Sequence, residues 1–228
     1  MKLNNCFVYP KTVRESIEGV RHYDVGKEKL PSVTTILKAT ESEEKKQSLA
    51  NWAQRIGDSA AEKIVSESAA RGTAMHKILE KYILEQGYLD LTNVGKQAHN
   101  MALRVIEQGL CNVPEYYGTE CTLYYPGLYA GQTDLVAVHK GQDTIIDFKQ
   151  TNKPKKREWI EDYCLQLAAY AMAHNFIYKT SITKGVVMMC SKDNFYQEFV
   201  IEGLEFQKHK HNFLRRVDEY YKNRSKKT

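Results

Sequence analysis

Two aspartates and a lysine lie close together in the middle of the chain, where two neighbouring strands are expected. Asp134 ends the run Gly-Gln-Thr-Asp, and Asp147 and Lys149 belong to the later run Ile-Ile-Asp-Phe-Lys-Gln. Residues 140–143, between the two predicted strands, have the composition of a hairpin turn. Because side chains alternate along a strand, Asp147 and Lys149 share one face, and pairing can bring Asp134 beside them. Two carboxylates and an ammonium group at one point suit a divalent metal, a phosphodiester and an attacking water.

The Asp-x-Lys tripeptide is common by itself. On an exposed strand face its two charged side chains usually form a solvated ion pair, so the tripeptide alone is weak support for a catalytic site. The preceding glycine and aspartate, at hairpin distance, strengthen the prediction. Polar residues elsewhere in the chain are therefore needed to decide it.

Five polar residues outside this hairpin are candidates to complete a site. His76 and Glu80 are four residues apart on one predicted helix, and Gln166 and Tyr170 have the same spacing on a later one, so each pair lies on one helix face. Glu120 lies on the strand before Asp134. Each has an ordinary alternative: a helical histidine is usually a surface or core residue, Gln and Tyr are common on amphipathic helices, and a strand glutamate is often solvated.

A basic run directly follows the strand of Asp147. It consists of Lys153, Lys155, Lys156 and Arg157, and we expect it to contact a nucleic-acid backbone. The net charge of +5 and the isoelectric point near 8.8 are only mildly basic, so the placement of the charges carries more weight than their sum. The basic residues at 222–228 are expected to form a solvated terminus.

The order of these motifs resembles that of the PD-(D/E)xK nuclease superfamily. The similarity is greatest to its RecB-type branch, and within that branch to the mitochondrial genome maintenance exonuclease family and its phage and bacterial relatives. Residues 21–37 resemble the first segment of that family and residues 49–57 its next helix, so the resemblance covers roughly residues 21–175.

The resemblance implies an α/β fold with a restriction-endonuclease-like core, in which a mixed β-sheet is flanked by helices and preceded by a helical N-terminal segment. We expect one nuclease domain over residues 1–228, divided into a helical part (1–110), a catalytic core (111–202) and a C-terminal helix with a basic tail (203–228). The sequence patterns predict helices at 33–37, 43–56, 58–86 with an interruption around 67–72, 92–108, 159–175 and 204–223, and strands at 117–125, 129–139, 144–149, 183–190 and 195–201.

The resemblance also implies a metal-dependent nuclease. Asp134 and Asp147 would hold one or two Mg²⁺ or Mn²⁺ ions, with His76, Glu120 and the backbone carbonyl of Phe148 completing the coordination. A histidine ligand favours Mn²⁺ somewhat over Mg²⁺.

The remaining site residues would act around this centre. Lys149 would orient or help deprotonate the attacking water, while Glu80, Gln166 and Tyr170 would support the site. Gln150 occupies a position where family members often carry threonine, and its amide can still hydrogen-bond to the scissile phosphate or the water.

The substrate implied is DNA, attacked by an exonuclease that prefers single-stranded ends because N-terminal helices arch over a threaded strand. A structure-selective endonuclease with the same chemistry is one alternative, and a nuclease-like DNA-binding module that no longer cuts is another. The second is disfavoured because Asp134, Asp147 and Lys149 are all present. One or two of the fifteen tyrosines could stack bases, although packing in strands is their default role.

Composition bounds the remaining classes. A chain of 228 residues with 42% hydrophobic content is expected to fold as one domain, and we expect a monomer. The five scattered cysteines contain no Cys-x-x-Cys and none follows Cys190, so we expect neither a disulfide framework, a zinc ribbon nor the iron–sulfur cluster of some RecB-type nucleases. No apolar run has membrane-spanning length and residues 1–10 do not resemble a signal peptide or presequence, so the expected location is the cytoplasm of a bacterium or phage-infected cell, with no membrane partner.

Overall fold

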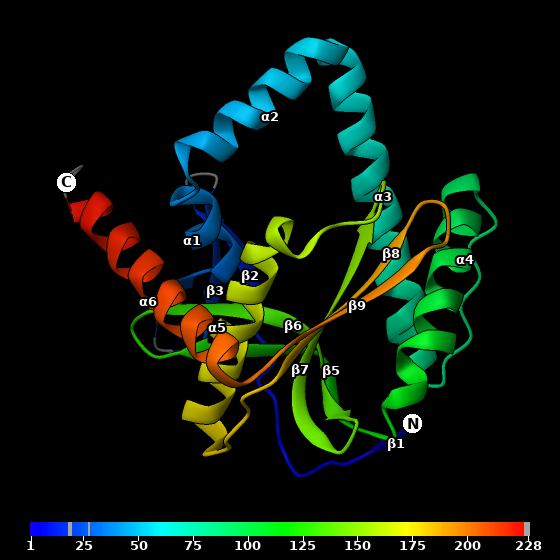
Figure 1. Ribbon diagram of the computed structural model, residues 1–228. Helices are drawn as coiled ribbons and strands as arrows, with labels where there is room; N and C mark the ends of the chain where they lie inside the picture. Colours follow the sequence, from blue (N-terminus) through cyan, green and yellow to red (C-terminus); the bar gives the residue numbers. More distant parts are fainter. Residues whose placement is uncertain (18–19, 27, 226–228) are drawn as a thin grey trace.

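The computed structural model of the protein describes residues 1–17, 20–26 and 28–225. Its centre is a six-stranded mixed sheet with the order β1-β5-β6-β7-β8-β9 (Figure 1). Strands β5, β6 and β7 form an antiparallel meander, β8 runs parallel to β7, and β9 returns antiparallel at the edge. The strands are β1 (Lys2–Leu3), β5 (Glu115–Tyr125), β6 (Tyr129–His139), β7 (Gln142–Thr151), β8 (Gly185–Ser191) and β9 (Tyr196–Ile201).

Helices cover both faces of this sheet. They are α1 (Val33–Ala39), α2 (Glu43–Ile56), α3 (Asp58–Ile83), α4 (Asn93–Gln108), α5 (Glu161–Tyr178) and α6 (Gly203–Ser225), with short 3₁₀ turns at Leu110–Asn112 and Arg157–Trp159. The C-terminal half of α3 and helix α4 pack on one face, and α1, α5 and α6 pack on the other. Alternation along the strands supplies both cores, since Leu135 and Ile146 point to α3 and α4 while Val136 and Ile145 point to α5.

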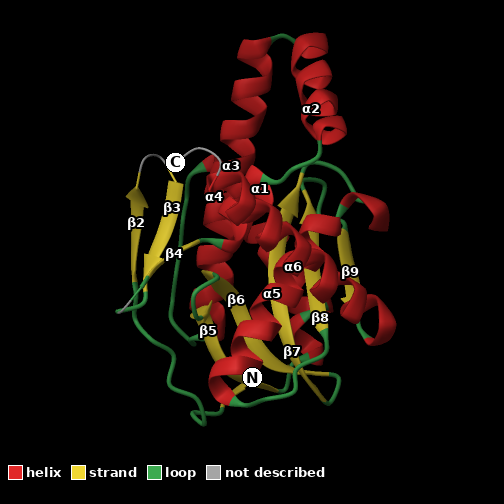
Figure 2. Ribbon diagram, turned by 90° about the vertical axis from the view of Figure 1, so that its left-hand side faces the viewer, coloured by secondary structure: helices red, strands yellow, loops and turns green. Residues whose placement is uncertain are grey.

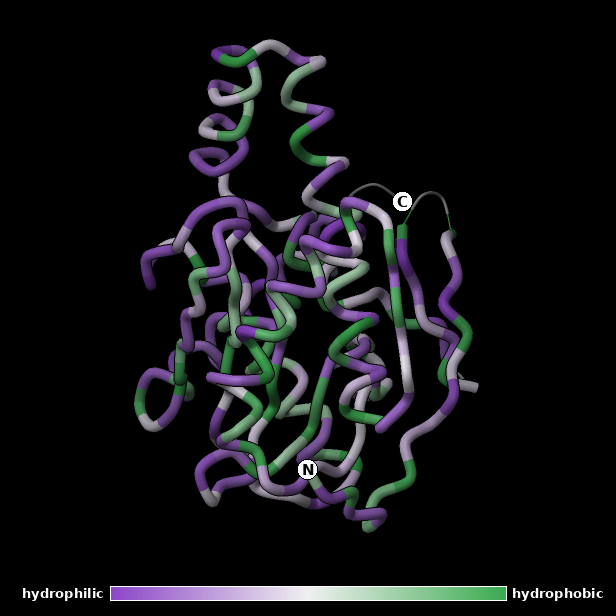
Figure 3. Tube along the Cα trace, turned by 90° about the vertical axis from the view of Figure 1, so that its right-hand side faces the viewer, coloured by the Kyte–Doolittle hydropathy of each residue, from purple (hydrophilic) through white to green (hydrophobic). Residues whose placement is uncertain are grey.

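The predicted α/β fold class, a mixed sheet flanked by helices, is therefore confirmed, and the predicted helices and core strands are present. Many of the hydrophobic segments of the chain lie inside the body of the molecule (Figure 3). Between β6 and β7 the turn is tighter than the predicted four residues: His139 already pairs with Gln142. Lys140 and Gly141 make the two-residue turn with φ of 50° and 81°, the left-handed values that such hairpins require.

Helices α2 and α3 form an arch that rises above the body (Figures 1 and 2). The chain reverses at Gly57, whose φ of 87° suits glycine. No residue of α2 is buried, and in α3 the buried positions, apart from Ala61, begin at Arg71. The arch is therefore solvent-exposed over most of its length, and α3 enters the core only in its second half.

In the N-terminal part, one sequence prediction is wrong and one element was missed. Helix α3 runs without the interruption expected around residues 67–72, because Arg71 and Gly72 pack against β7 and stabilise helical backbone there. A second sheet, β2 (Val13–Ile17), β3 (Val20–Asp24) and β4 (Lys29–Pro31), stands beside the main one and was not predicted (Figure 2). Its strands are short and rich in polar residues, and β2 is largely exposed, so they lack the alternating apolar pattern that identifies a strand.

The C-terminal residues continue α6 as far as Ser225, and the end of the predicted basic tail, residues 226–228, lies outside the described residues. In the described part of the chain, no helix combines the length and apolar character needed to cross a lipid bilayer.

Candidate functional site

The site forms where β6 and β7 separate. Their pairing extends to Leu135 opposite Ile146 and stops there. In place of the next ladder bond, the side chain of Asp134 turns into the gap and its Oδ2 accepts a hydrogen bond of 2.6 Å from the backbone N–H of Phe148. The Asp134 carboxylate is thus fixed between two strands and can be reached from the α3 side of the sheet.

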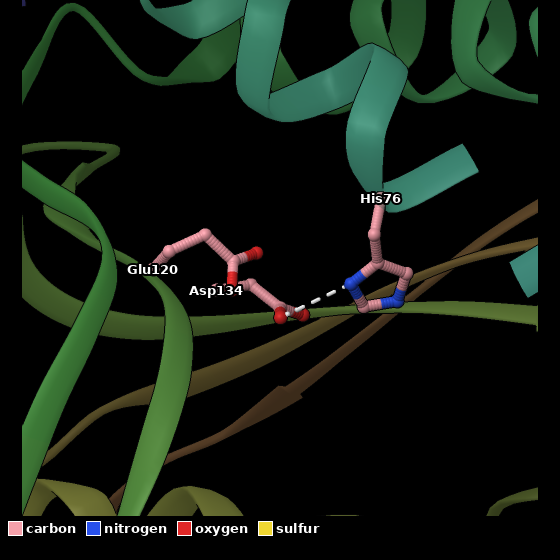
Figure 4. Close-up of side chains that lie close together, drawn as sticks. All are labelled: His76, Glu120 and Asp134. Carbon is pink, nitrogen blue, oxygen red and sulfur yellow. Dashed lines mark ion pairs between the residues drawn. The ribbon is translucent and has the colours of Figure 1, made fainter. Parts of the chain in front are cut away.

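His76 reaches this carboxylate from α3. Its Nδ1 lies 3.1 Å from Asp134 Oδ1 (Figure 4). The imidazole also makes an edge contact with the ring of Phe148, with the ring centroids 6.3 Å apart. The predicted histidine is therefore held by β6 and β7 together, on the part of α3 that is anchored in the core.

Glu120 approaches from β5 and has an unusual backbone. Its φ is 51°, in a region that a non-glycine residue rarely adopts, and the ladder pairs on both sides of it are regular. Gln132 Nε2 donates a 2.9 Å hydrogen bond to the Glu120 carbonyl and so compensates the local distortion. Strained backbone of this kind concentrates at functional sites, which argues against an ordinary solvated strand glutamate.

His76, Glu120 and Asp134 together form a group of potential metal ligands. One ligand atom from each lies within 4.8 Å of the others, and Figure 4 shows the two carboxylates and the imidazole converging. Carboxylate and imidazole donors at this spacing could hold a divalent metal ion.

Asp147 and Lys149 lie next to this group and bind each other. The Lys149 ammonium forms an ion pair with Asp147 Oδ2, as the shared strand face predicted. Lys149 Nζ also lies 5.0 Å from the ring centroid of Tyr163 on α5, a cation–π contact that orients the side chain. Asp147 is 2% exposed, so its charge depends on these neighbours.

The environment separates the pKa values of the three carboxylates. Burial, together with repulsion from Asp134, raises the pKa of Asp147 to about 6 and that of Glu120 to about 7. Burial also acts to raise the pKa of Asp134, but attraction by His76 and Lys149 outweighs it and the pKa is lowered.

The pKa values of the two basic groups, His76 and Lys149, are raised above their usual values. Burial acts against their charged forms, but the attraction of Asp134 on His76, and of Asp147 and Asp134 on Lys149, raises both pKa values. The site thus has excess acidic groups in a desolvated position, as expected for a cation site.

The predicted supporting residues have distinct places. Gln166 Nε2 donates to the Tyr170 hydroxyl at 3.1 Å, both side chains being buried. The Tyr170 ring lies over Gly131, where an added Cβ would come within 2.7 Å of it, so the close approach of α5 to β6 needs glycine. Glu80, in contrast, is not in the group of potential ligands: its carboxylate pairs with Lys77 at 2.8 Å.

Gln150 has a partner that sequence reasoning missed. Arg71, 3% exposed, donates from Nε to Gln150 Oε1 at 3.2 Å and also binds Ser68 and the Asn152 side chain. These contacts tie α3 to the end of the strand that carries Asp147. The only signal in the sequence is the Arg-Gly pair shortly before His76, which does not reveal burial.

In the basic run, Arg157 makes an ion pair and a hydrogen bond within the protein, and the lysines differ in exposure. Arg157 pairs with Glu205 and donates to the Val200 carbonyl at 2.7 Å, so its guanidinium braces the start of α5 against β9 and α6. The side chains of Lys153 and Lys156 are exposed, and that of Lys155 is half-buried.

An open cavity of about 930 Å³ adjoins the candidate ligands. It is bordered by His76 and Lys77 of α3, by Glu120, and by Arg14 and Arg21 of the small sheet. The two arginines were not identified from the sequence, because the strands that bring them here were not predicted.

The chain has significant sequence similarity to one group of named proteins. It is 28% identical over 203 residues to mitochondrial genome maintenance exonuclease 1 of Mus musculus and 28% identical over 176 residues to that of Homo sapiens, which covers 84% and 72% of the chain. The matches cover 59% and 50% of those relatives, so the chain spans little more than half of their length. No protein-family model matches it.

Sequence identity to solved structures is lower than to these relatives. The alkaline exonuclease LHK-Exo of Laribacter hongkongensis superposes with a TM-score of 0.31 and 14% identity, covering 67% of this chain and 84% of that one. The sequence similarities confirm the resemblance to PD-(D/E)xK-like nucleases that the motifs predicted.

Proposed function

We propose that this chain is a metal-dependent DNA nuclease that hydrolyses phosphodiester bonds, and that it acts as an exonuclease on single-stranded ends. The observation that carries the proposal is the meeting of His76, Glu120 and Asp134 beside the buried Asp147–Lys149 pair. The names of the relatives, which are exonucleases, point to the same class. The assignment to the RecB-type branch belongs to this proposal.

The donor set fits one or two divalent cations. Asp134 and Asp147 supply carboxylate oxygens from adjacent strands, with His76, Glu120 and the Phe148 carbonyl as further ligands. When bound, a cation at such a site lowers the pKa of its water and neutralises charge on the reacting phosphate. The residues suit Mn²⁺ or Mg²⁺, and the imidazole favours Mn²⁺ somewhat.

Lys149 acts as a fixed positive charge. Asp147 and Asp134 raise its pKa against the effect of burial, and the ammonium would orient the attacking water and stabilise the phosphate. The contact with the Tyr163 ring and the ion pair with Asp147 hold the ammonium in place.

The other polar residues position this machinery. Gln166 and Tyr170 brace β6 through the close contact at Gly131. Gln150, held by Arg71, presents its amide at the end of the catalytic strand, where a phosphate or water would hydrogen-bond to it. Glu80 supports α3 through its pair with Lys77.

The substrate proposal rests on the arch and the basic run. A strand entering beneath α2 and α3 would have to do so by its end, which favours exonuclease over endonuclease action. Lys153, Lys155 and Lys156 follow the catalytic strand, where contacts to the DNA backbone would form. We further propose that residues 1–228 act as one nuclease domain and as a monomer. All five cysteines are free, which is compatible with the reducing cytoplasm that we propose as its location.

Digestion of end-labelled DNA tests the proposal. Linear single-stranded, linear double-stranded and circular single-stranded DNA are each incubated with Mg²⁺, with Mn²⁺ or with EDTA. We expect linear single strands to be shortened progressively in Mg²⁺ or Mn²⁺, circles to survive, and nothing to be cut in EDTA.

Two results would contradict the proposal in different ways. Rapid nicking of the circle, by protein that is free of contaminating nuclease, would replace the exonuclease with a structure-selective endonuclease. Tight DNA binding with no cleavage in either metal would leave only a DNA-binding module.

A further inference from the structure

A second cleft lies between α2 and the segment that connects β7 to α5. Its volume is about 890 Å³, and none of its lining residues borders the cavity beside His76. Trp52 projects into it from α2, and Trp159 and Lys155 project from the connecting segment. The chain has two tryptophans in all, and both line this cleft.

The exposure of Trp159 is unusual for its type. The residue is 58% exposed, whereas tryptophan is on average among the more buried residues. Lys156 Nζ lies 5.4 Å from its ring centroid, so one cation already sits over this ring. A large aromatic surface left in water beside lysines suits a ligand that has both flat rings and negative charge.

The charges in the cleft leave cations without partners. Lys45 pairs with Glu41 and with Asp162. Within the described ranges, Arg55 and Lys155 make no ion pair, and Glu44 is the one cleft carboxylate that makes none. The cleft therefore has an excess of positive charge for anionic groups of a ligand.

The cleft is connected to the candidate catalytic strand through a short, fixed segment. Lys155 is six positions after Lys149, so the Cα atoms of the two lie no more than about 21 Å apart. Gln197 holds the backbone of Lys155 on both sides, accepting from its N–H at 2.7 Å and donating to its carbonyl at 2.8 Å. Asn152, between them, is bound by Arg71 of α3. A short single-stranded DNA bound at the candidate site beside Lys149 of β7 could therefore also reach the cleft.

We propose that this cleft is a base-stacking subsite for single-stranded DNA, in which bases stack on Trp52 and Trp159 and the backbone contacts Arg55 and Lys155. The proposal rests on the proposed nuclease function and extends it with a place for nucleotides beyond the scissile phosphate. Stacking on aromatic rings is tolerant of sequence because every base has a π-face, which suits an enzyme that digests any strand. A duplex would offer stacked, paired bases and could not use the rings.

Intrinsic fluorescence tests the proposal directly, because all tryptophan emission comes from this cleft. Oligothymidylate of about 12 nucleotides is titrated into the protein in EDTA, which prevents metal-dependent cleavage. We expect marked quenching, and expect an abasic oligonucleotide of the same length to bind more weakly and to quench little, since it carries the phosphates without the bases.

Substitutions assign the effect to each ring. Trp159→Ala and Trp52→Ala, measured by fluorescence anisotropy of labelled oligothymidylate, should each weaken binding by about fivefold or more. Trp159→Phe should recover part of the loss because a phenyl ring still stacks. The matched control is Phe176→Ala, which removes an aromatic ring that is 42% exposed at the far end of α5, about 22 Å along the helix from its start.

Two outcomes would overturn the stacking subsite. One is equal affinity and equal quenching for the abasic and thymidylate strands. The other is binding by folded Trp159→Ala within twofold of the parent, the fold being checked by circular dichroism. If the parent protein still degrades DNA in Mn²⁺ in those cases, the nuclease proposal stands; if the parent shows quenching but never cleaves, the subsite stands and the nuclease proposal fails.

Discussion

Helices α2 and α5 are of similar length but lie in opposite environments. Every residue of α5 from 164 to 174 is buried, because the helix is enclosed by the sheet, α1 and α6. Helix α2 buries none of its residues. Local features contribute to its stability: Ser42 caps its N-terminus, Glu43 and Glu44 occupy its first turn, and Lys46 pairs with Glu43 on its surface. Lys45 also ties it to α5 through an ion pair with Asp162.

The difference separates two kinds of residue. The residues proposed to carry out the chemistry are on packed elements, where small displacements are costly. The residues proposed to contact the DNA are on the exposed arch and on the loop below it. Helix α3 joins the two, since its first half belongs to the arch and its second half places His76 at Asp134. Substitutions in the packed body should therefore change catalysis or stability, and substitutions in the arch or loop should change binding alone.

The largest expected effect is on catalysis. Lys149→Ala should reduce the rate of single-strand cleavage by about a hundredfold or more, because it removes the charge that orients the water and stabilises the phosphate. DNA affinity should remain close to that of the parent. Lys153→Ala, four residues further along the same segment but exposed, is the control and should retain most of the activity; equal reductions in both variants would remove the distinction between site and loop.

Binding should depend on the loop below the arch. Replacing Lys153, Lys155 and Lys156 by alanine should weaken binding of all single-stranded sequences to a similar extent and reduce the salt dependence of affinity by about 0.7 for each phosphate that the protein no longer neutralises. Anisotropy titrations at several salt concentrations measure both. Weaker binding with an unchanged salt slope would indicate local misfolding instead of the removal of phosphate-binding charges.

Stability should depend on the body and not on the arch. Gly131→Ala would place a methyl group 2.7 Å from the Tyr170 ring, and overpacking of this kind costs about 1–3 kcal/mol in the free energy of unfolding. Lys46→Ala on α2 should change that free energy by less than about 0.5 kcal/mol. Urea unfolding compares the two, and similar effects would mean that the arch is part of the cooperative core.

The pH dependence of stability should reflect His174, which is buried in the body. Burial lowers the pKa of His174 to about 4, only weakly opposed by Asp143, while its ring hydrogen-bonds to Tyr9 and Thr180. Because this value is below that of the unfolded chain, about 6.5, neutral His174 stabilises the fold fully above pH 6.5 and progressively less as pH falls towards 4. His174→Gln should therefore be less stable than the parent at pH 7, with the gap narrowing towards pH 4; a constant gap in urea unfolding would refute a titrating His174.

Much of the body could be predicted from the sequence because its signals are local. The β6–β7 hairpin follows from its turn residues and the alternation of its strands. The facing of Asp147 and Lys149 follows from strand geometry alone.

The remaining features depend on contacts between distant parts of the chain. The left-handed backbone of Glu120, the burial of Arg71 against Gln150 and the pairing of Arg157 with Glu205 each require a partner from another element. The small sheet that brings Arg14 to the cavity has strands too short and too polar to identify alone. The sequence therefore predicted which candidate ligands lie close together better than it predicted the residues that surround them.

We propose that the residues at the separation of β6 and β7 hold a divalent cation, and calorimetric titration of Mn²⁺ tests this most directly. The parent should bind Mn²⁺, Asp134→Asn should lose measurable binding while keeping an acceptor for the Phe148 N–H, and His76→Ala should bind more weakly. His99→Ala, which alters an exposed histidine on α4, should bind as the parent does. Unchanged Mn²⁺ affinity in Asp134→Asn and His76→Ala would contradict the assignment of the site.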